Sequence, residues 1–85
     1  MSDYKQVAED VIAAFILDSK KLSSPIPLLR AKKEIAKLAT GDVLQIQSTD
    51  PGSRNDLRGW CQRSGHEYLG EKEEGTFISF FLRKS

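Results

Sequence analysis

The chain contains one cysteine and one histidine among its 85 residues. A single cysteine, Cys61, cannot form a disulfide within the chain, so a reducing compartment such as the cytoplasm is the expected location. One cysteine and one histidine are also too few for a zinc site, which usually takes four protein or water ligands. These two scarcities predict a cytoplasmic protein without a disulfide and without a metal.

Long hydrophobic runs and an excess of one charge are lacking as well. The longest apolar run, Val11 to Leu17, is far shorter than the roughly 20 residues that cross a membrane. The first residues do not show the basic-then-apolar order of a secretory signal. Thirteen basic and 12 acidic side chains leave a net charge of +1, without the basic excess typical of nucleic-acid-binding proteins. We therefore expect a single small domain with no membrane partner.

The spacing of apolar residues predicts alternating strands and helices. A buried apolar run predicts a strand over 14–18, and further strands are predicted over 43–48, 67–72 and 76–83. Amphipathic spacing predicts two helices, one that begins at Pro25 and ends before Gly41 and one that begins at Pro51 and ends before Gly65. The segment 4–14 has helix-like spacing and is either a short helix or an early extension of the first strand. Two amphipathic helices and four strands pack most economically as an α+β fold, with both helices on one face of a four-stranded mixed sheet.

Both predicted helices begin with a polar residue followed by proline. Ser24 is the predicted N-cap of the first helix, with Pro25 at its first position and Pro27 at its third. Asp50 is the predicted N-cap of the second helix. Because Pro27 has no N–H, the Ser24 hydroxyl is expected to cap the N–H of Ile26. A helix N-terminus favours negative charge, so a cysteine at position 24 would be a reactive thiolate, whereas this chain presents a hydroxyl.

Several short motifs together resemble those of the small sulfur carriers typified by TusA, a family that includes SirA-like and YedF-like proteins. The family pattern Leu-Asp-x-x-Gly-x-x-Cys-Pro-x-Pro is followed by a basic helix and further motifs. The matching segments here are Leu17-Asp18, Ser24-Pro25-Ile26-Pro27, Lys32-Lys33, Gly41-Asp42-Val43-Leu44, Thr49-Asp50-Pro51 and Gly65-His66-Glu67. The resemblance implies a two-layer α/β sandwich in the order βαβαββ, with residues 1–14 as an N-terminal extension and 15–85 as the carrier domain.

The resemblance also implies a role in sulfur relay. A cysteine of the family takes a persulfide from a cysteine desulfurase and passes it to an acceptor, for example in tRNA thiolation or sulfur metabolism, without a cofactor or metal. That cysteine falls on Ser24, and the family glycine falls on Lys21. A serine hydroxyl cannot carry sulfane sulfur, so Ser24 reflects either natural loss of the thiol or an engineered replacement. The second departure at Lys21 favours natural divergence.

Residues near position 24 are candidates for partner docking. Three basic residues of the first helix, Arg30, Lys32 and Lys33, are placed to contact an acidic partner close to Ser24. Their alternative role is the solvated face of a helix. Asp50 belongs to the same candidate surface, with an N-cap as its alternative role. The expected partners are a cysteine desulfurase and a downstream acceptor protein, and we expect the chain to be a monomer.

Two further hypotheses concern Cys61 and His66, and two concern the function of the whole chain. Cys61 shares a helical face with Leu57 and Trp60, which predicts a packed, inert thiol rather than a second sulfur site. His66 is the only candidate base for a serine nucleophile, but it follows the far end of the second helix. Besides a sulfur carrier, the sequence is compatible with a non-catalytic docking or regulatory module. An RNA-binding domain is a weaker alternative by fold analogy, because the net charge is nearly neutral.

Overall fold

The computed structural model describes residues 11–85, which form four strands and two helices. In chain order these are β1 Phe15–Ser19, α1 Ile26–Ile35, β2 Val43–Ser48, α2 Ser53–Ser64, β3 Glu67–Glu73 and β4 Ile78–Arg83. Most of the predicted segment 4–14 lies outside the described residues. Its described part, 11–14, is not helical, and the Ala14 N–H donates to the Val43 carbonyl at 2.7 Å. This bond extends the pairing of β1 with β2 by one residue.

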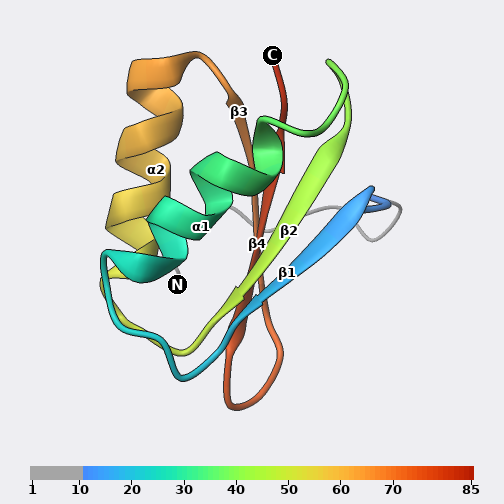
Figure 1. The fold of residues 1–85 in the computed structure, drawn as a ribbon. Helices are drawn as coiled ribbons and strands as arrows, with labels where there is room; N and C mark the ends of the chain where they lie inside the picture. Colours follow the sequence, from blue (N-terminus) through green and yellow to red (C-terminus); the bar gives the residue numbers. More distant parts are fainter. Residues whose placement is uncertain (1–10) are drawn as a thin grey trace.

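The strands form one mixed sheet in the order β1-β2-β4-β3. β1 and β2 are parallel neighbours, and β4 runs antiparallel to both β2 and β3. Both helices cover the same face of this sheet (Figure 1). The structure confirms the predicted α+β sandwich of two layers with the order βαβαββ.

The core lies between the helices and the sheet, because inward and outward side chains alternate along the strands. On β2, Leu44 and Ile46 are fully buried under the helices. The remaining buried members of this core are Leu17, Ala31, Ile35, Leu57, Trp60, Cys61, Phe80 and Leu82. Cys61 therefore packs in the core, as its spacing predicts.

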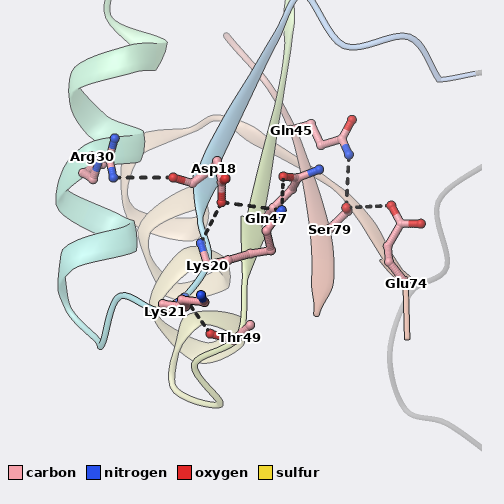
Figure 2. Close-up of polar contacts among 9 residues, drawn as sticks. All are labelled: Asp18, Lys20, Lys21, Arg30, Gln45, Gln47, Thr49, Glu74 and Ser79. Atoms are coloured by element: carbon pink, nitrogen blue, oxygen red, sulfur yellow. Dashed lines mark hydrogen bonds and ion pairs between the residues drawn. The ribbon is translucent and has the colours of Figure 1, made fainter. Parts of the chain in front are cut away.

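Polar contacts line the opposite face of the sheet (Figure 2). Gln45 Nε2 donates to Ser79 Oγ at 3.0 Å, and Ser79 Oγ donates to Glu74 Oε2 at 2.8 Å. Gln47 accepts a hydrogen bond from Lys20 Nζ at 3.2 Å. These residues face away from the helices, on a face that also carries the apolar residues Ile16, Val43 and Phe81.

The start of α1 differs from the prediction by one residue. Pro25 is the N-cap, α1 begins at Ile26, and no side chain caps it. The Ile26 N–H donates to the backbone carbonyl of Ser23 at 2.9 Å, so the Ser24 hydroxyl is not needed there. The prediction of Ser24 as N-cap, with Pro25 and Pro27 at the first and third helical positions, is therefore wrong. The Ser24–Pro25 peptide bond is cis.

The start of α2 is later than predicted, whereas its end is as predicted. Gly52, not Asp50, is the N-cap, and Asp50 Oδ2 accepts a hydrogen bond from the Gly52 N–H at 2.8 Å. Asp50 thus stabilises the turn that precedes the helix, the two-residue pattern typical of aspartate side chains. Gly65 ends α2 with a φ of 87°, a left-handed conformation that glycine adopts without steric cost.

The end of α1 comes earlier than the Gly41 stop predicts. α1 ends at Ile35, and a connection of turns leads to β2. Gly41 lies within that connection with a φ of 93°. The glycine therefore serves the turn into β2 rather than the end of the helix.

A buried ion pair that the sequence analysis did not identify joins α2 to β3. Glu71 is 1 % exposed, and it accepts hydrogen bonds from Arg54 Nη2 at 2.6 Å and Arg54 Nε at 2.9 Å. Tyr68 Oη donates to the same carboxylate at 3.1 Å. A register shift between Tyr68 and Gly70 places both Tyr68 and Glu71 toward the helices, which regular alternation would not allow. Burial, together with the Glu71 carboxylate, raises the pKa of Tyr68.

Candidate functional site

Two loops meet at one end of the molecule because β1 and β2 are parallel neighbours. Their carboxyl ends lie at the same edge of the sheet, and each continues into a loop and then a helix. The N-termini of α1 and α2 consequently lie at the same end of the molecule (Figure 1). Backbone N–H groups and helix dipoles at this end favour negative charge.

Ser24 is exposed at this meeting point and contacts α2 directly. Its Oγ donates a hydrogen bond to the Asp56 carboxylate. The loop of Ser24 also packs closely against Gly52: a Cβ at position 52 would lie 3.2 Å from the Ser24 Cβ and 2.9 Å from Asp50 Oδ2. The absence of a side chain at Gly52 therefore allows the two loops to pack this closely.

Asp56 is the principal residue of the site that the sequence analysis missed. It lies in the first turn of α2, and its N–H donates to the Gly52 carbonyl at 3.1 Å. Side chains on a helix point back toward its N-terminus, which directs the Asp56 carboxylate to the neighbouring loop. The sequence signal for Asp56 is an acidic residue in the first turn of a predicted helix, but its contact with Ser24 depends on the parallel pairing of β1 and β2, which no local pattern gives.

Lys21, at the family glycine position, has a left-handed backbone. Its φ is 69°, and its N–H donates to Thr49 Oγ1 at 2.9 Å, which links the two loops (Figure 2). Glycine adopts this conformation without steric cost, whereas other L-residues do so at a cost of roughly 1 to 2 kcal/mol. This backbone geometry would suit the glycine that the resemblance predicts here, and this chain has a lysine in the same turn.

The basic residues of α1 divide into two kinds. Arg30, Lys32 and Lys33 are all exposed, but only Arg30 has a contact with the sheet: its Nη1 donates to the Asp18 carbonyl of β1 at 3.4 Å (Figure 2). Arg30 therefore also has a structural role at the edge of the sheet. All three basic residues are on the helix that begins beside Ser24, and their role in docking stays a prediction.

Exposed apolar residues, which the sequence analysis did not single out, lie on the same helix. Ile26 and Leu29 are 41 % and 52 % exposed. Residues three and four apart form one stripe on a helix, so Ile26, Leu29 and Lys33 are neighbours on its surface. We call Pro25, Ile26, Leu29 and Lys33 the α1 surface. This surface lies beside position 24, and in it the apolar side chains of Ile26 and Leu29 are next to the positive charge of Lys33.

Two other candidate residues lie away from this site. Cys61 is buried, and burial raises the pKa of its thiol to about 11, which makes it a poor nucleophile. His66 follows α2, whose 12 residues span about 18 Å, and its ring contacts Trp60 edge-on with centroids 5.2 Å apart. Its Nδ1 accepts a hydrogen bond from the Ser85 N–H at 3.1 Å. The structure does not bring His66 to Ser24, so His66 is not placed to act as the base for a serine nucleophile.

Comparison with known families identifies the family. The family model for sulfurtransferase TusA matches residues 15–84. The chain belongs to the TusA family. The sulfur carrier protein TusA of Allochromatium vinosum is 41 % identical over 69 residues, which cover 81 % of this chain and 91 % of that protein. The homologues named as sulfur carriers support a sulfur-carrier role for this TusA-family chain.

Other relatives of this TusA-family chain agree in sequence and in fold. YrkF of Bacillus subtilis is 46 % identical over 72 residues, which cover 85 % of this chain but 39 % of YrkF, so the chain spans about two fifths of that relative. The crystal structure of the SirA-like protein from Desulfitobacterium hafniense superposes with a TM-score of 0.68 at 28 % identity. This match covers 81 % of this chain and 95 % of that one.

Among residues 11–85, neither helix has the length and apolar character needed to cross a membrane. In the same part of the chain, no three His, Cys, Asp or Glu side chains gather into a group that could hold a metal ion.

Proposed function

We propose that this TusA-family chain acts in sulfur relay through the loop of Ser24 and the α1 surface. Position 24 is the sulfur-bearing position, a cysteine desulfurase is the donor, and an acceptor protein downstream, for example in tRNA thiolation, is the recipient. The observation that carries this proposal is the exposure of Ser24 where the two helix N-termini meet. Cys61, the only thiol of the chain, is buried in the core.

The chemistry of relay requires sulfur at position 24. A thiolate there would attack the outer sulfur of the donor's persulfide, the sulfur–sulfur bond of the donor would break, and the donor cysteine would leave as a thiolate. Two helix N-termini favour the thiolate and the persulfide anion that this step needs. A serine hydroxyl performs no such exchange, so the chain with Ser24 docks to the partners without carrying sulfur.

The α1 surface supports docking that does not depend on the residue at position 24. Ile26 and Leu29 are apolar side chains that water covers in the free protein, and burying them against a partner is favourable. Lys33 and Lys32 flank them and favour a partner surface with carboxylates around an apolar centre. Asp50 supports the loop beside this surface through its bond to Gly52.

The test is sulfur uptake by the Ser24→Cys variant. We expect this variant, incubated with a cysteine desulfurase and cysteine, to gain the mass of one sulfur atom, located by peptide mass spectrometry at position 24. The unchanged chain, whose only thiol is Cys61, is the matched control and should gain none. A Ser24→Cys variant that stays unmodified while a thiol-bearing TusA accepts sulfur from the same desulfurase would contradict the proposal.

A second function, regulation by competition, is favoured by the Ser24–Asp56 hydrogen bond, which gives the hydroxyl a defined place in the site. A chain that docks and does not carry sulfur occupies the donor and blocks a carrier. We expect the unchanged chain, added in excess, to slow sulfur transfer from the desulfurase to the Ser24→Cys variant. Transfer at an undiminished rate would refute this regulatory role.

A further inference from the structure

The side chain at position 24 faces two opposed electrostatic influences. The N-termini of α1 and α2 favour an anion there. The Asp56 carboxylate, which accepts the hydrogen of the Ser24 hydroxyl, disfavours an anion and favours a group that keeps its hydrogen. The balance between these influences decides whether a sulfur group at this position is charged.

Three charged side chains belong to the surroundings of position 24. Asp56 comes from α2 and contacts residue 24 directly. Asp50 comes from the loop before α2, and its carboxylate bonds to the Gly52 N–H at 2.8 Å. Lys21 lies three residues earlier in the same loop as Ser24, with its side chain exposed. Asp56 is the carboxylate whose hydrogen-bond partner is the side chain of residue 24 itself.

We propose that Asp56 is a positioning residue that directs the hydrogen of the side chain at position 24 toward α2 and, where that side chain is a thiol, favours its protonated form. The inference rests on the proposed function, in which residue 24 is the sulfur-bearing position. In a thiol-bearing form, Asp56 would offset the effect of the two helix N-termini. The sulfur group would then be neutral at a higher pH, and therefore less reactive, than the two helix N-termini alone would make it.

The test compares thiol reactivity with and without the Asp56 charge. The Ser24→Cys variant is combined with Asp56→Asn, and in a matched control with Asp42→Asn. Asp42 precedes β2 at the opposite end of the strand, where its Oδ2 accepts the Ala39 N–H at 3.0 Å, so the control removes the same charge far from the site. The rate of alkylation by iodoacetamide at position 24 is measured from pH 5 to 10, with mass spectrometry separating it from alkylation of Cys61.

We expect Asp56→Asn to move the midpoint of the rate–pH profile to lower pH by about one unit, which gives about tenfold faster alkylation at neutral pH. The Asp42→Asn control should leave the midpoint in place. A midpoint that does not move with Asp56→Asn, moves upward, or moves equally with Asp42→Asn would overturn the proposal. Asp56→Ser, which removes the charge and keeps a polar residue in the first helical turn, must shift the profile in the same direction.

The alkylation experiment and the sulfur-uptake experiment can succeed or fail independently of each other. Alkylation measures the charge state at position 24 and needs no partner protein, whereas sulfur uptake needs a desulfurase. A shifted alkylation profile without sulfur uptake would refute the relay proposal and support the role of Asp56. Sulfur uptake with an unshifted profile would support relay and refute the role of Asp56. Thermal unfolding of each variant shows that the compared proteins are folded.

Discussion

Replacing Lys21 with glycine should stabilise the protein. Lys21 is the one non-glycine residue with a positive φ within residues 11–85, at 69°. Relief of the left-handed strain is worth roughly 1 to 2 kcal/mol, and glycine costs about 0.5 to 1 kcal/mol by increasing the freedom of the unfolded chain. The bond to Thr49 is made by the backbone N–H and is kept in the variant. The central values leave a net gain in unfolding free energy of about 0.75 kcal/mol, within limits of about 0 and 1.5 kcal/mol.

Urea unfolding followed by the fluorescence of Trp60, the only tryptophan, measures this gain. The midpoint should rise without a change in the slope of free energy against urea, and the melting temperature should rise by about 3 to 6 °C. Lys21→Ala is the matched control, because alanine removes the long side chain and keeps the strained Cβ. If Lys21→Gly is no more stable than Lys21→Ala, backbone strain does not explain the glycine of the family pattern.

Two further predictions concern docking and alkaline stability. Leu29→Ser should weaken binding to a desulfurase about tenfold, measured by calorimetry, because the variant buries less apolar surface against the partner. The control is Ile16→Ser, because Ile16 is equally exposed but lies on the opposite face of the sheet, and this change should leave the affinity unaltered. Equal losses of affinity in the two variants would contradict docking through the α1 surface. Burial raises the pKa of Cys61 from 9.0 to about 11, so its thiol favours the folded state below pH 9 and this contribution disappears as the pH rises to 11. Between pH 9 and 11 the unchanged chain should lose about 2 to 3 kcal/mol of unfolding free energy more than the Cys61→Ala variant loses. An equal loss in both proteins would show that the Cys61 thiol is not the group responsible.

The existence and order of the elements could be predicted because each has a clear apolar pattern. Leu57, Trp60 and Cys61 recur at helical spacing, and the structure buries all three. Helix starts were less predictable, since a polar residue before proline resembles an N-cap whether or not its side chain is used. Position 24 shows this: a backbone carbonyl takes the Ile26 N–H, and the hydroxyl is left to bond elsewhere.

The residues missed by the sequence analysis depend on contacts between distant segments. The pair of Glu71 and Arg54 is 17 residues apart in the chain and meets because a bulge reverses the alternation of β3. Asp56 is 32 residues from Ser24, and only the parallel pairing of β1 and β2 brings their following helices together. Neither contact has a local periodicity that a sequence pattern could reveal.

The sequence by itself therefore determined the two-layer fold and the TusA family, because these depend on local periodicity and on motifs at constant spacing, and it predicted position 24 as the sulfur-bearing position. The tertiary structure alone decided what surrounds that position. It placed the Asp56 carboxylate against Ser24, a left-handed backbone at Lys21 and apolar side chains on the α1 surface. The physical reason is that charge state and docking depend on distances between side chains from different elements, and those distances exist only once the sheet has aligned the two helix N-termini.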